Sequence, residues 1–371
     1  MSEFRVPLEK PKPDNERFID VLMGKQTTDR PPIIDYLPDD SVMRLILEQL
    51  IGRKWIYPYR VEAVIKKAIT DDKEMIAAYW DNYIEFWYRL GYDYVRLEMG
   101  YDFALERRVT KDTASEGNRA WAEEAEGMIQ TWDDFEKYPW PKLEEVDFLP
   151  FEYVSAHLPE GMKMIASHAG GPMEWLTWML SMEGLSMLLY DNPDLVEAVM
   201  NRMGDLFVRF YEQLLDIPNI CALLTGDDMG FKTATIISPK HLRQYILPWH
   251  KKFAQMAHAK GIPYFLHSCG NVEAIMESLI EDVKIDGKHS FEDVIIPAAV
   301  FHQKYGNRIA TLGGVDMDYI SRHTADEVRQ YVRDLIESCS PMGRFAVGTG
   351  NSIANYIPLE NYLTMLDEAL K

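Results

Sequence analysis

The sequence predicts an α/β protein built as a single (β/α)8 TIM barrel, with an N-terminal arm and a long insertion after the second strand. Three observations lead to this prediction: eight apolar, β-rich runs, helical spacing of apolar residues between them, and no Gly-rich phosphate turn after the first run. Strands that alternate with helices indicate a parallel sheet. Eight strands without the dinucleotide turn favour a closed barrel over an open doubly wound sheet.

The predicted strands are short runs rich in β-branched, aromatic and other apolar residues. They span 32–36, 94–99, 163–167, 220–225, 263–267, 283–288, 308–313 and 345–349. The predicted helices repeat apolar residues three or four positions apart. They span 70–90, 192–215, 239–260, 272–281, 324–338 and 358–370. In the first of them, one face carries Met75, Tyr79, Tyr83, Phe86 and Leu90.

Three of these helices begin with recognisable capping chemistry. Asn192 and Ser238 are each followed by proline, which is favoured at the first helical position because it has no N–H to satisfy. Thr324 has Glu327 three residues later, the pattern of a capping box. These signals fix the predicted helix starts.

Residues 1–30 are expected to form the arm and residues 31–371 the barrel, with 100–160 as a lid or insertion. That segment is far longer than an ordinary βα loop and is rich in Trp, Glu and Asp. Within it, 107–110 and 119–121 are expected to pair as a hairpin, and a helix is expected to start at 131–134. Because the insertion follows the second strand, we expect it over the C-terminal mouth of the barrel.

Composition and charge restrict the possible partners. The chain has 371 residues, 47% of them hydrophobic, which is enough for a large core and argues against disorder. With 39 Lys+Arg against 59 Asp+Glu, its net charge of −20 disfavours nucleic acid and anionic membranes. There is neither a signal-peptide pattern nor a long apolar run, so a cytoplasmic protein is expected.

Polar residues follow nearly every predicted strand, and a barrel brings such residues to one mouth. They are Asp35, Glu98, His168, Asp227, Asp228, His267, Cys269, His289, Asp316 and Asn351. Singly, an Asp or His at a strand end is more often a helix cap or a loop hydrogen-bonder, which applies to Asp35, Asp316 and His168. Asp227 and Asp228 are a stronger signal, because adjacent acids that precede no helix start repel each other unless a cation or donor meets them.

The sharpest signal is His267-Ser268-Cys269, directly after an apolar strand. A His-x-Cys pair on an extended segment places an imidazole and a thiolate on the same side, within reach of one Zn²⁺, and zinc accepts both ligand types. The structural alternative is a buried thiol beside a capping histidine. Cys221 is expected in the core and Cys339 at the opposite end of the barrel, so neither supplies a second sulfur.

Four stretches carry a resemblance to a known family: FLHSCGNVEAIMESLIE, GDDMGFKTATIISPKHLRQYILPWHKKF, LGGVDMDYI and GNSIANYIPLENYLTMLDEAL. Over roughly residues 90–371 the sequence resembles the uroporphyrinogen decarboxylase superfamily, and within it the corrinoid-dependent methyltransferase branch. The resemblance implies a (β/α)8 barrel. True uroporphyrinogen decarboxylases carry an Arg-rich loop after strand 1, whereas this chain has DYLPDDSVMRL there, so porphyrinogen decarboxylation ranks second.

In the methyltransferase branch, the resemblance implies zinc held by His267 and Cys269 together with a cysteine after strand 8. In this sequence Asn351 stands at that last position, so either another residue completes the site or the metal is lost. The first alternative is expected, with a third ligand from Asp228, Glu98, His289 or Asn351.

The implied function is a zinc-dependent methyltransferase that moves a methyl group between a small methyl ether, amine or thiol and a corrinoid on a separate protein. For a methyl ether the reaction is an O-demethylation. Glu98, Asp227 and Asp228 are expected to supply protons, and His168, His289 and Asn351 to contact substrate. The alternative is a decarboxylase that binds a carboxylated substrate through Arg96 and Arg107. A homodimer is possible, as for many barrels.

Overall fold

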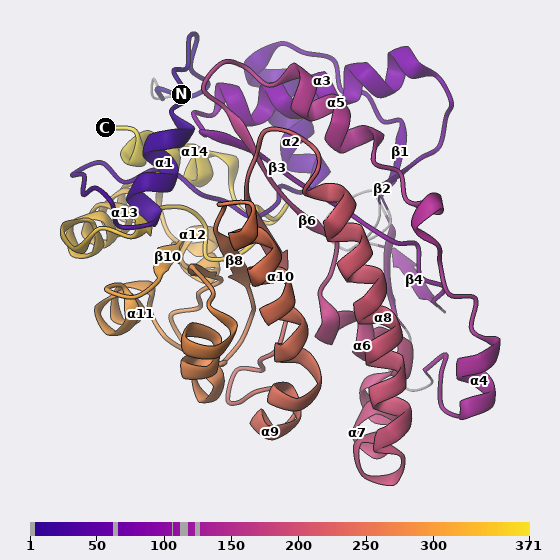
Figure 1. The fold of residues 1–371 in the computed structure, drawn as a ribbon. Coiled ribbons are helices and arrows are strands. Elements are labelled where there is room, and N and C mark those ends of the chain that lie inside the picture. The colour runs from indigo at the N-terminus through magenta and orange to yellow at the C-terminus, as the bar shows by residue number, and fades with distance from the viewer. Residues whose placement is uncertain (1–3, 62–65, 106, 112–117, 123–126) are drawn as a thin grey trace.

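The structure, a computed structural model, describes residues 4–61, 66–105, 107–111, 118–122 and 127–371. Its centre is a curled sheet of seven parallel strands in the order β11-β10-β9-β8-β7-β6-β3 (Figure 1). The strands are β3 (Tyr94–Met99), β6 (Lys163–His168), β7 (Ile220–Gly226), β8 (Tyr264–His267), β9 (Gly287–His289), β10 (Ala310–Leu312) and β11 (Phe345–Ala346). Each of the seven lies in one of the predicted strand runs or extends it by one residue, so the α/β class and the parallel sheet are confirmed.

The first predicted strand, 32–36, lies beside β11 but forms a single parallel bridge, Ile33 to Val347, rather than a strand. Two backbone hydrogen bonds hold it there, from Ile34 N to Val347 O and from Val347 N to Pro32 O, both 2.9 Å. Pro31 and Pro32 have no N–H to donate, which limits regular pairing at its start. On its other side, Tyr94 Oη accepts the Asp35 N–H at 2.8 Å. Among the described residues, the central sheet thus has seven strands and a bridged eighth segment.

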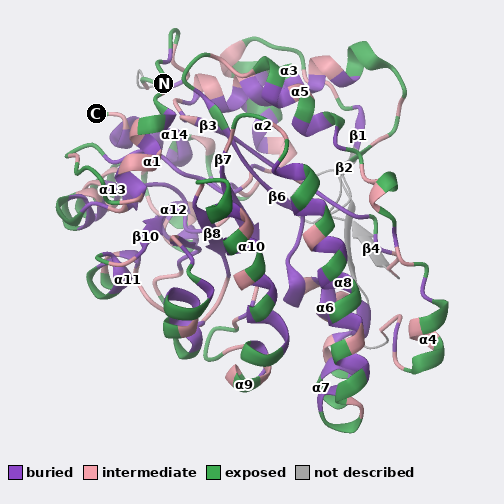
Figure 2. Cartoon of the chain, viewed as in Figure 1, coloured by how far each residue is buried: buried purple, intermediate pink, exposed green. Residues whose placement is uncertain are grey.

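Helices surround the sheet, with their outer faces exposed and the strands buried (Figure 2). They are α1 (Asn15–Leu22), α2 (Asp40–Ile46), α3 (Lys73–Arg89), α4 (Trp132–Lys137), α5 (Leu149–His157), α6 (Pro172–Leu180), α7 (Met182–Asp191), α8 (Pro193–Leu214), α9 (Pro239–His241), α10 (Leu247–Ala259), α11 (Ala298–Tyr305), α12 (Met317–Arg322), α13 (Ala325–Cys339) and α14 (Leu359–Ala369). A π-helical turn joins α9 to α10. No helix in the described ranges is long and apolar enough to cross a membrane.

The predicted capping signals are only partly realised. The Thr324–Glu327 capping box forms, and Ser238 Oγ accepts the His241 N–H at 3.2 Å. Asn192 precedes α8 as expected, but its side chain makes no cap hydrogen bond. In α3 the predicted apolar face is buried except for Met75, which lies in the exposed first turn.

The insertion contains the predicted hairpin, as β4 (Arg107–Lys111) pairs antiparallel with β5 (Asn118–Ala122). The predicted helix is α4, with Thr131 as its N-cap. The last part of 100–160 is α5, which contacts α3 and β6 and so occupies the place of a crossover helix. A second hairpin, β1 (Tyr59–Val61) with β2 (Lys66–Ala68), was not expected from the sequence.

Candidate metal centre

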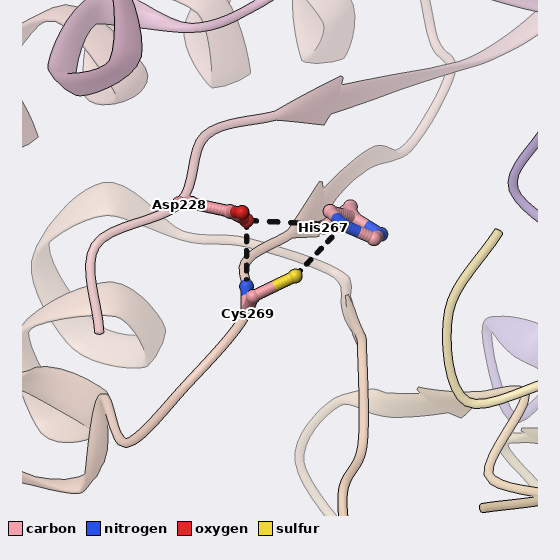
Figure 3. Close-up of side chains that lie close together, drawn as sticks. All are labelled: Asp228, His267 and Cys269. Atoms are coloured by element: carbon pink, nitrogen blue, oxygen red, sulfur yellow. Dashed lines mark hydrogen bonds and ion pairs between the residues drawn. The ribbon is translucent and has the colours of Figure 1, made fainter. Parts of the chain in front are cut away.

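Three side chains from two neighbouring strand ends converge at the C-terminal edge of the sheet (Figure 3). His267 is the last residue of β8, Cys269 follows it, and Asp228 lies in the loop after β7. His267 Nε2 lies 3.4 Å from Cys269 Sγ and 3.8 Å from Asp228 Oδ1. One ligand atom from each residue lies within 4.8 Å of the other two. This nitrogen, sulfur and oxygen set is one that zinc accepts.

The backbone around Cys269 is fixed by close contacts. The Cys269 N–H donates to Asp228 Oδ1 at 2.8 Å, which ties the two loops together. Gly270 has a φ of +75°, and a Cβ there would lie 2.1 Å from Gly230 O. Glycine after the cysteine is therefore required for the β8 loop to pack on the β7 loop.

Hydrogen bonding fixes which nitrogen of His267 is free. His289 Nε2 lies 3.0 Å from Thr349 O, and a carbonyl can only accept, so His289 Nε2 carries the proton. His289 Nδ1 must then accept from His267 Nδ1, 2.7 Å away. Burial lowers the pKa of both rings, that of His289 to about 3, so both are neutral. His267 Nε2 is left as a lone pair that faces Cys269 and Asp228.

The third-ligand candidates are now separated by geometry. Asp228 lies in the cluster, whereas both nitrogens of His289 are engaged elsewhere. Asn351 Nδ2 lies 3.2 Å from Cys269 Sγ, while its Oδ1 accepts the Ser352 N–H at 2.8 Å. Asn351 therefore presents an N–H to the sulfur rather than a ligand oxygen. Burial, followed by the Asp228 charge, raises the pKa of Cys269 above that of an ordinary thiol.

Glu98 is linked to the cluster through Tyr36. The Tyr36 hydroxyl donates to Glu98 Oε2 at 2.7 Å, and its ring stacks on that of His267 with centroids 4.0 Å apart. Arg96 Nη2 donates to the same Glu98 oxygen at 2.7 Å and also to Ser167 Oγ and Leu224 O. Glu98 thus holds the residue that packs on His267.

The adjacent acids Asp227 and Asp228 point to different partners. Asp227 is buried and accepts the backbone N–H groups of Met173 at 3.1 Å and Glu174 at 2.9 Å, at the start of α6. It also lies 2.7 Å from His250 Nε2. The sequence places no helix after the pair, yet in space Asp227 caps one that lies fifty residues earlier. Asp227 therefore positions α6, and its predicted proton-transfer role stays a prediction.

His168 lies buried between two strand ends. Its Nε2 accepts the Tyr101 N–H at 3.0 Å, and its Nδ1 lies 3.1 Å from Gly170 O. Both nitrogens are therefore used by backbone groups and do not face the cluster. Asp316 and Asp35 have the structural roles that are common for an acid at a strand end. Asp316 accepts the backbone N–H of Tyr319, and Asp35 accepts that of Thr349.

One acid was missed by the sequence interpretation. Glu174, in the first turn of α6, is partly exposed, yet its surroundings desolvate its carboxyl group. This burial, followed by the charges of Asp228 and Asp227, raises its pKa well above the ordinary value. The signal was Gly171-Pro172 directly after β6, a helix start with an acid three residues on.

The parallel sheet and its His–Cys–Asp cluster define an α/β protein with a candidate metal centre at the carboxyl ends of its strands. The chain belongs to the uroporphyrinogen decarboxylase (URO-D) family, whose model matches residues 126–371. Among solved structures, it is similar to a methyltransferase from Methanosarcina mazei, with a TM-score of 0.67 and 16% sequence identity over 95% of this chain and 97% of that one. No curated protein matches. The family expected from the four stretches is thus confirmed.

Proposed function

We propose that this protein is a zinc-dependent methyltransferase that moves a methyl group between a small methyl ether, amine or thiol and a corrinoid on a separate protein. The proposal draws on the family and on the methyltransferase among its structural neighbours. As part of this proposal, we interpret residues 32–36 as the eighth strand, which would complete a (β/α)8 barrel.

The observation that carries the proposal is the orientation of His267. Its Nε2 lone pair faces Cys269 Sγ at 3.4 Å and Asp228 Oδ1 at 3.8 Å, so nitrogen, sulfur and oxygen donor atoms converge on one point. Two acceptors held face to face beside a thiol are stabilised by a cation. His267, Cys269 and Asp228 are therefore the residues that would hold zinc, and the His267–His289–Thr349 chain supplies the outer hydrogen bonds that metal-binding histidines require.

Zinc bound there would act as a Lewis acid on the heteroatom of the substrate. The protein's own acids handle the proton. Because burial raises the pKa of Glu174, its carboxyl group retains a proton that can pass to a departing oxygen or nitrogen. Asp227 holds Glu174 in place through the α6 backbone, and Glu98 orients Tyr36 against the His267 ring.

The alternative function is decarboxylation of a carboxylated substrate, which is supported by the uroporphyrinogen decarboxylase family to which the chain belongs. It requires arginines that are free to bind carboxylates. Arg96 is buried and bonded to Glu98, Ser167 and backbone carbonyls, so it is not free. The side chain of Arg107 lies outside the described residues.

The test is metal analysis of protein purified without chelator, for the wild type, His267→Ala and Cys269→Ala, with Cys221→Ala as a control for loss of a buried thiol. We expect about one zinc per chain, lost in both site variants and kept in the control. The same proteins are then mixed with a reduced or methylated corrinoid protein, whose spectrum should change only with the wild type and the control. A folded wild type without metal would overturn the zinc mechanism.

A further inference from the structure

A small cavity adjoins the cluster between the loops that follow β8 and β9. Its volume is about 110 Å³, and its apolar walls come from Val272, Met276, Ile295, Ile296 and Phe301. The polar residues that line it are Asn271, Glu273, Lys288, Ser290 and Glu292. A larger cavity, about 540 Å³, is lined by the N-terminal arm and by residues just before β3, so it lies at the other end of the sheet. Ser290 lines the small cavity, and its Oγ lies 3.9 Å from Cys269 Sγ. The small cavity thus borders the candidate metal centre, with Ser290 between them.

The cavity also contains a buried cation. Lys288 in β9 lines it and is 3% exposed. Its Nζ donates to Ser290 O at 2.5 Å and to Ser268 O at 3.4 Å, and lies 4.6 Å from the Phe291 ring centre. Two carbonyls satisfy two of the three N–H donors of an ammonium.

Lys288 makes no ion pair within 4.0 Å among the residues that the structure describes. Asp228, Glu292 and the thiol of Cys269 act on it only from farther away. A buried charge without a counter-ion is unfavourable unless a partner arrives, and in a chain with 59 acids a buried unpaired lysine is unexpected. This ammonium therefore has both a free donor and an unmatched charge on the cavity wall.

We propose that the cavity is a subsite for the carboxylate of a small organic acid, bound by the Lys288 ammonium, with the apolar walls around its carbon chain. The inference deepens the proposed function, on which it rests for naming this acid as the substrate. Since Ser290 lies between the cavity and Cys269, the methylated heteroatom of the acid would lie toward the cluster.

Charge and size restrict the acid further. Two glutamates line the cavity, Glu292 and Glu273, of which Glu273 is paired with Lys304 and Tyr305. Together with the nearby Asp228 they repel a second negative charge, so the ligand is a monocarboxylate. A cavity of about 150 Å³ holds a benzene ring. At about 110 Å³ this one suits a short aliphatic acid better than an aromatic one.

The experiment is calorimetric titration of the protein with propionate, with succinate and propionamide as charge controls. Lys288→Met removes the ammonium and keeps an apolar stem, Ile295→Trp fills the cavity without altering the lysine, and Lys251→Met removes an exposed lysine paired with Asp282. We expect the wild type and Lys251→Met to bind propionate more tightly than succinate or propionamide. Loss of a charge-assisted hydrogen bond should weaken binding at least about tenfold in Lys288→Met, and Ile295→Trp should abolish it.

Equal propionate affinity in wild type and a folded Lys288→Met, or no binding by wild type, overturns the subsite. If Lys288→Met does not fold, undiminished binding by Ile295→Trp overturns it instead. Repeating the titration on chelator-treated protein separates this inference from the zinc mechanism. Propionate bound without metal supports the subsite even if the zinc proposal fails, whereas binding that disappears with the metal assigns the carboxylate to the metal and overturns the subsite.

Discussion

Replacement of His289 by phenylalanine tests the tautomer that the structure assigns to His267. The change keeps a buried ring but removes the acceptor of His267 Nδ1 and the donor to Thr349 O. His267 can then protonate at either nitrogen, so the Nε2 lone pair is no longer held toward Cys269. Loss of such an outer partner lowers metal affinity about 10- to 100-fold, which corresponds to about 1.4–2.7 kcal/mol.

Stability should fall as well, because two buried polar groups lose their partners. At about 1–3 kcal/mol for each unsatisfied group, the free energy of unfolding should decrease by about 2–6 kcal/mol. The matched control is His302→Phe, another buried histidine, whose Nδ1 lies 2.9 Å from Thr311 Oγ1 on the outer side of β10. The control should lose stability but keep its affinity for zinc.

Zinc affinity is measured by competition with a chromophoric chelator at neutral pH, and stability by urea denaturation followed by circular dichroism. The two readouts separate a local effect on the ligand from general destabilisation. A folded His289→Phe protein that binds zinc as tightly as the wild type would refute the assigned tautomer and its role.

Three further predictions follow from neighbouring contacts. Asn351→Cys places a thiol where an amide now lies 3.2 Å from Cys269 Sγ, so zinc affinity in the same competition assay should rise at least about tenfold; unchanged affinity contradicts this. Asp227→Asn replaces one of the two carboxylate oxygens that accept the Met173 and Glu174 N–H groups by an amide N–H and so weakens the α6 cap. Urea denaturation should therefore show a loss of about 1–3 kcal/mol, and an unchanged stability argues against the cap. Burial lowers the pKa of His168 to about 3, against about 6.5 when unfolded. Below about pH 6.5 the unfolded chain therefore binds one more proton than the folded chain, so the free energy of unfolding falls as the pH drops toward 3. His168→Gln should reduce the slope of unfolding free energy against pH by about 1.4 kcal/mol per pH unit, and an unchanged slope would contradict the buried neutral His168.

The strands that the sequence predicts best are those with long apolar runs. β3, β6, β7 and β8 agree with their predicted ranges within one residue at each end, because buried strands are read from such runs. The range 283–288 was too long, since Ser278–Val283 forms a π-helical turn that ends at Lys284 with a φ of +68°. A short apolar run does not distinguish a buried helix end from a strand.

Two helices near the site escaped prediction for a related reason. α6 is apolar on most of its surface, and α7 is short, so neither shows the polar and apolar faces on which periodicity depends. Missing α6 also concealed the partner of Asp227, because the cap is contributed by a residue distant in sequence.

The site shows the same division between local and distant information. His267 and Cys269 are two residues apart, so their common direction follows from strand geometry alone. The choice of Asp228 over His289 depends on contacts with Thr349, sixty residues beyond His289, which no local pattern encodes. Lys288 was not predicted as a site residue, because a lysine within a strand is expected to be exposed unless its burial is known.

The balance of charge around the cluster gives a reason for its composition. Glu98 is paired with Arg96, and Asp227 with His250. Asp228 and Glu174 have no cationic partner within ion-pair distance in the described part of the chain, since the His267 ring beside Asp228 is neutral, and burial raises the pKa of both. A divalent cation favours the ionised forms of Asp228 and Cys269, so metal binding would release the protons that burial retains there. Under the proposed zinc mechanism, Asp228 would thus favour a cation at this site.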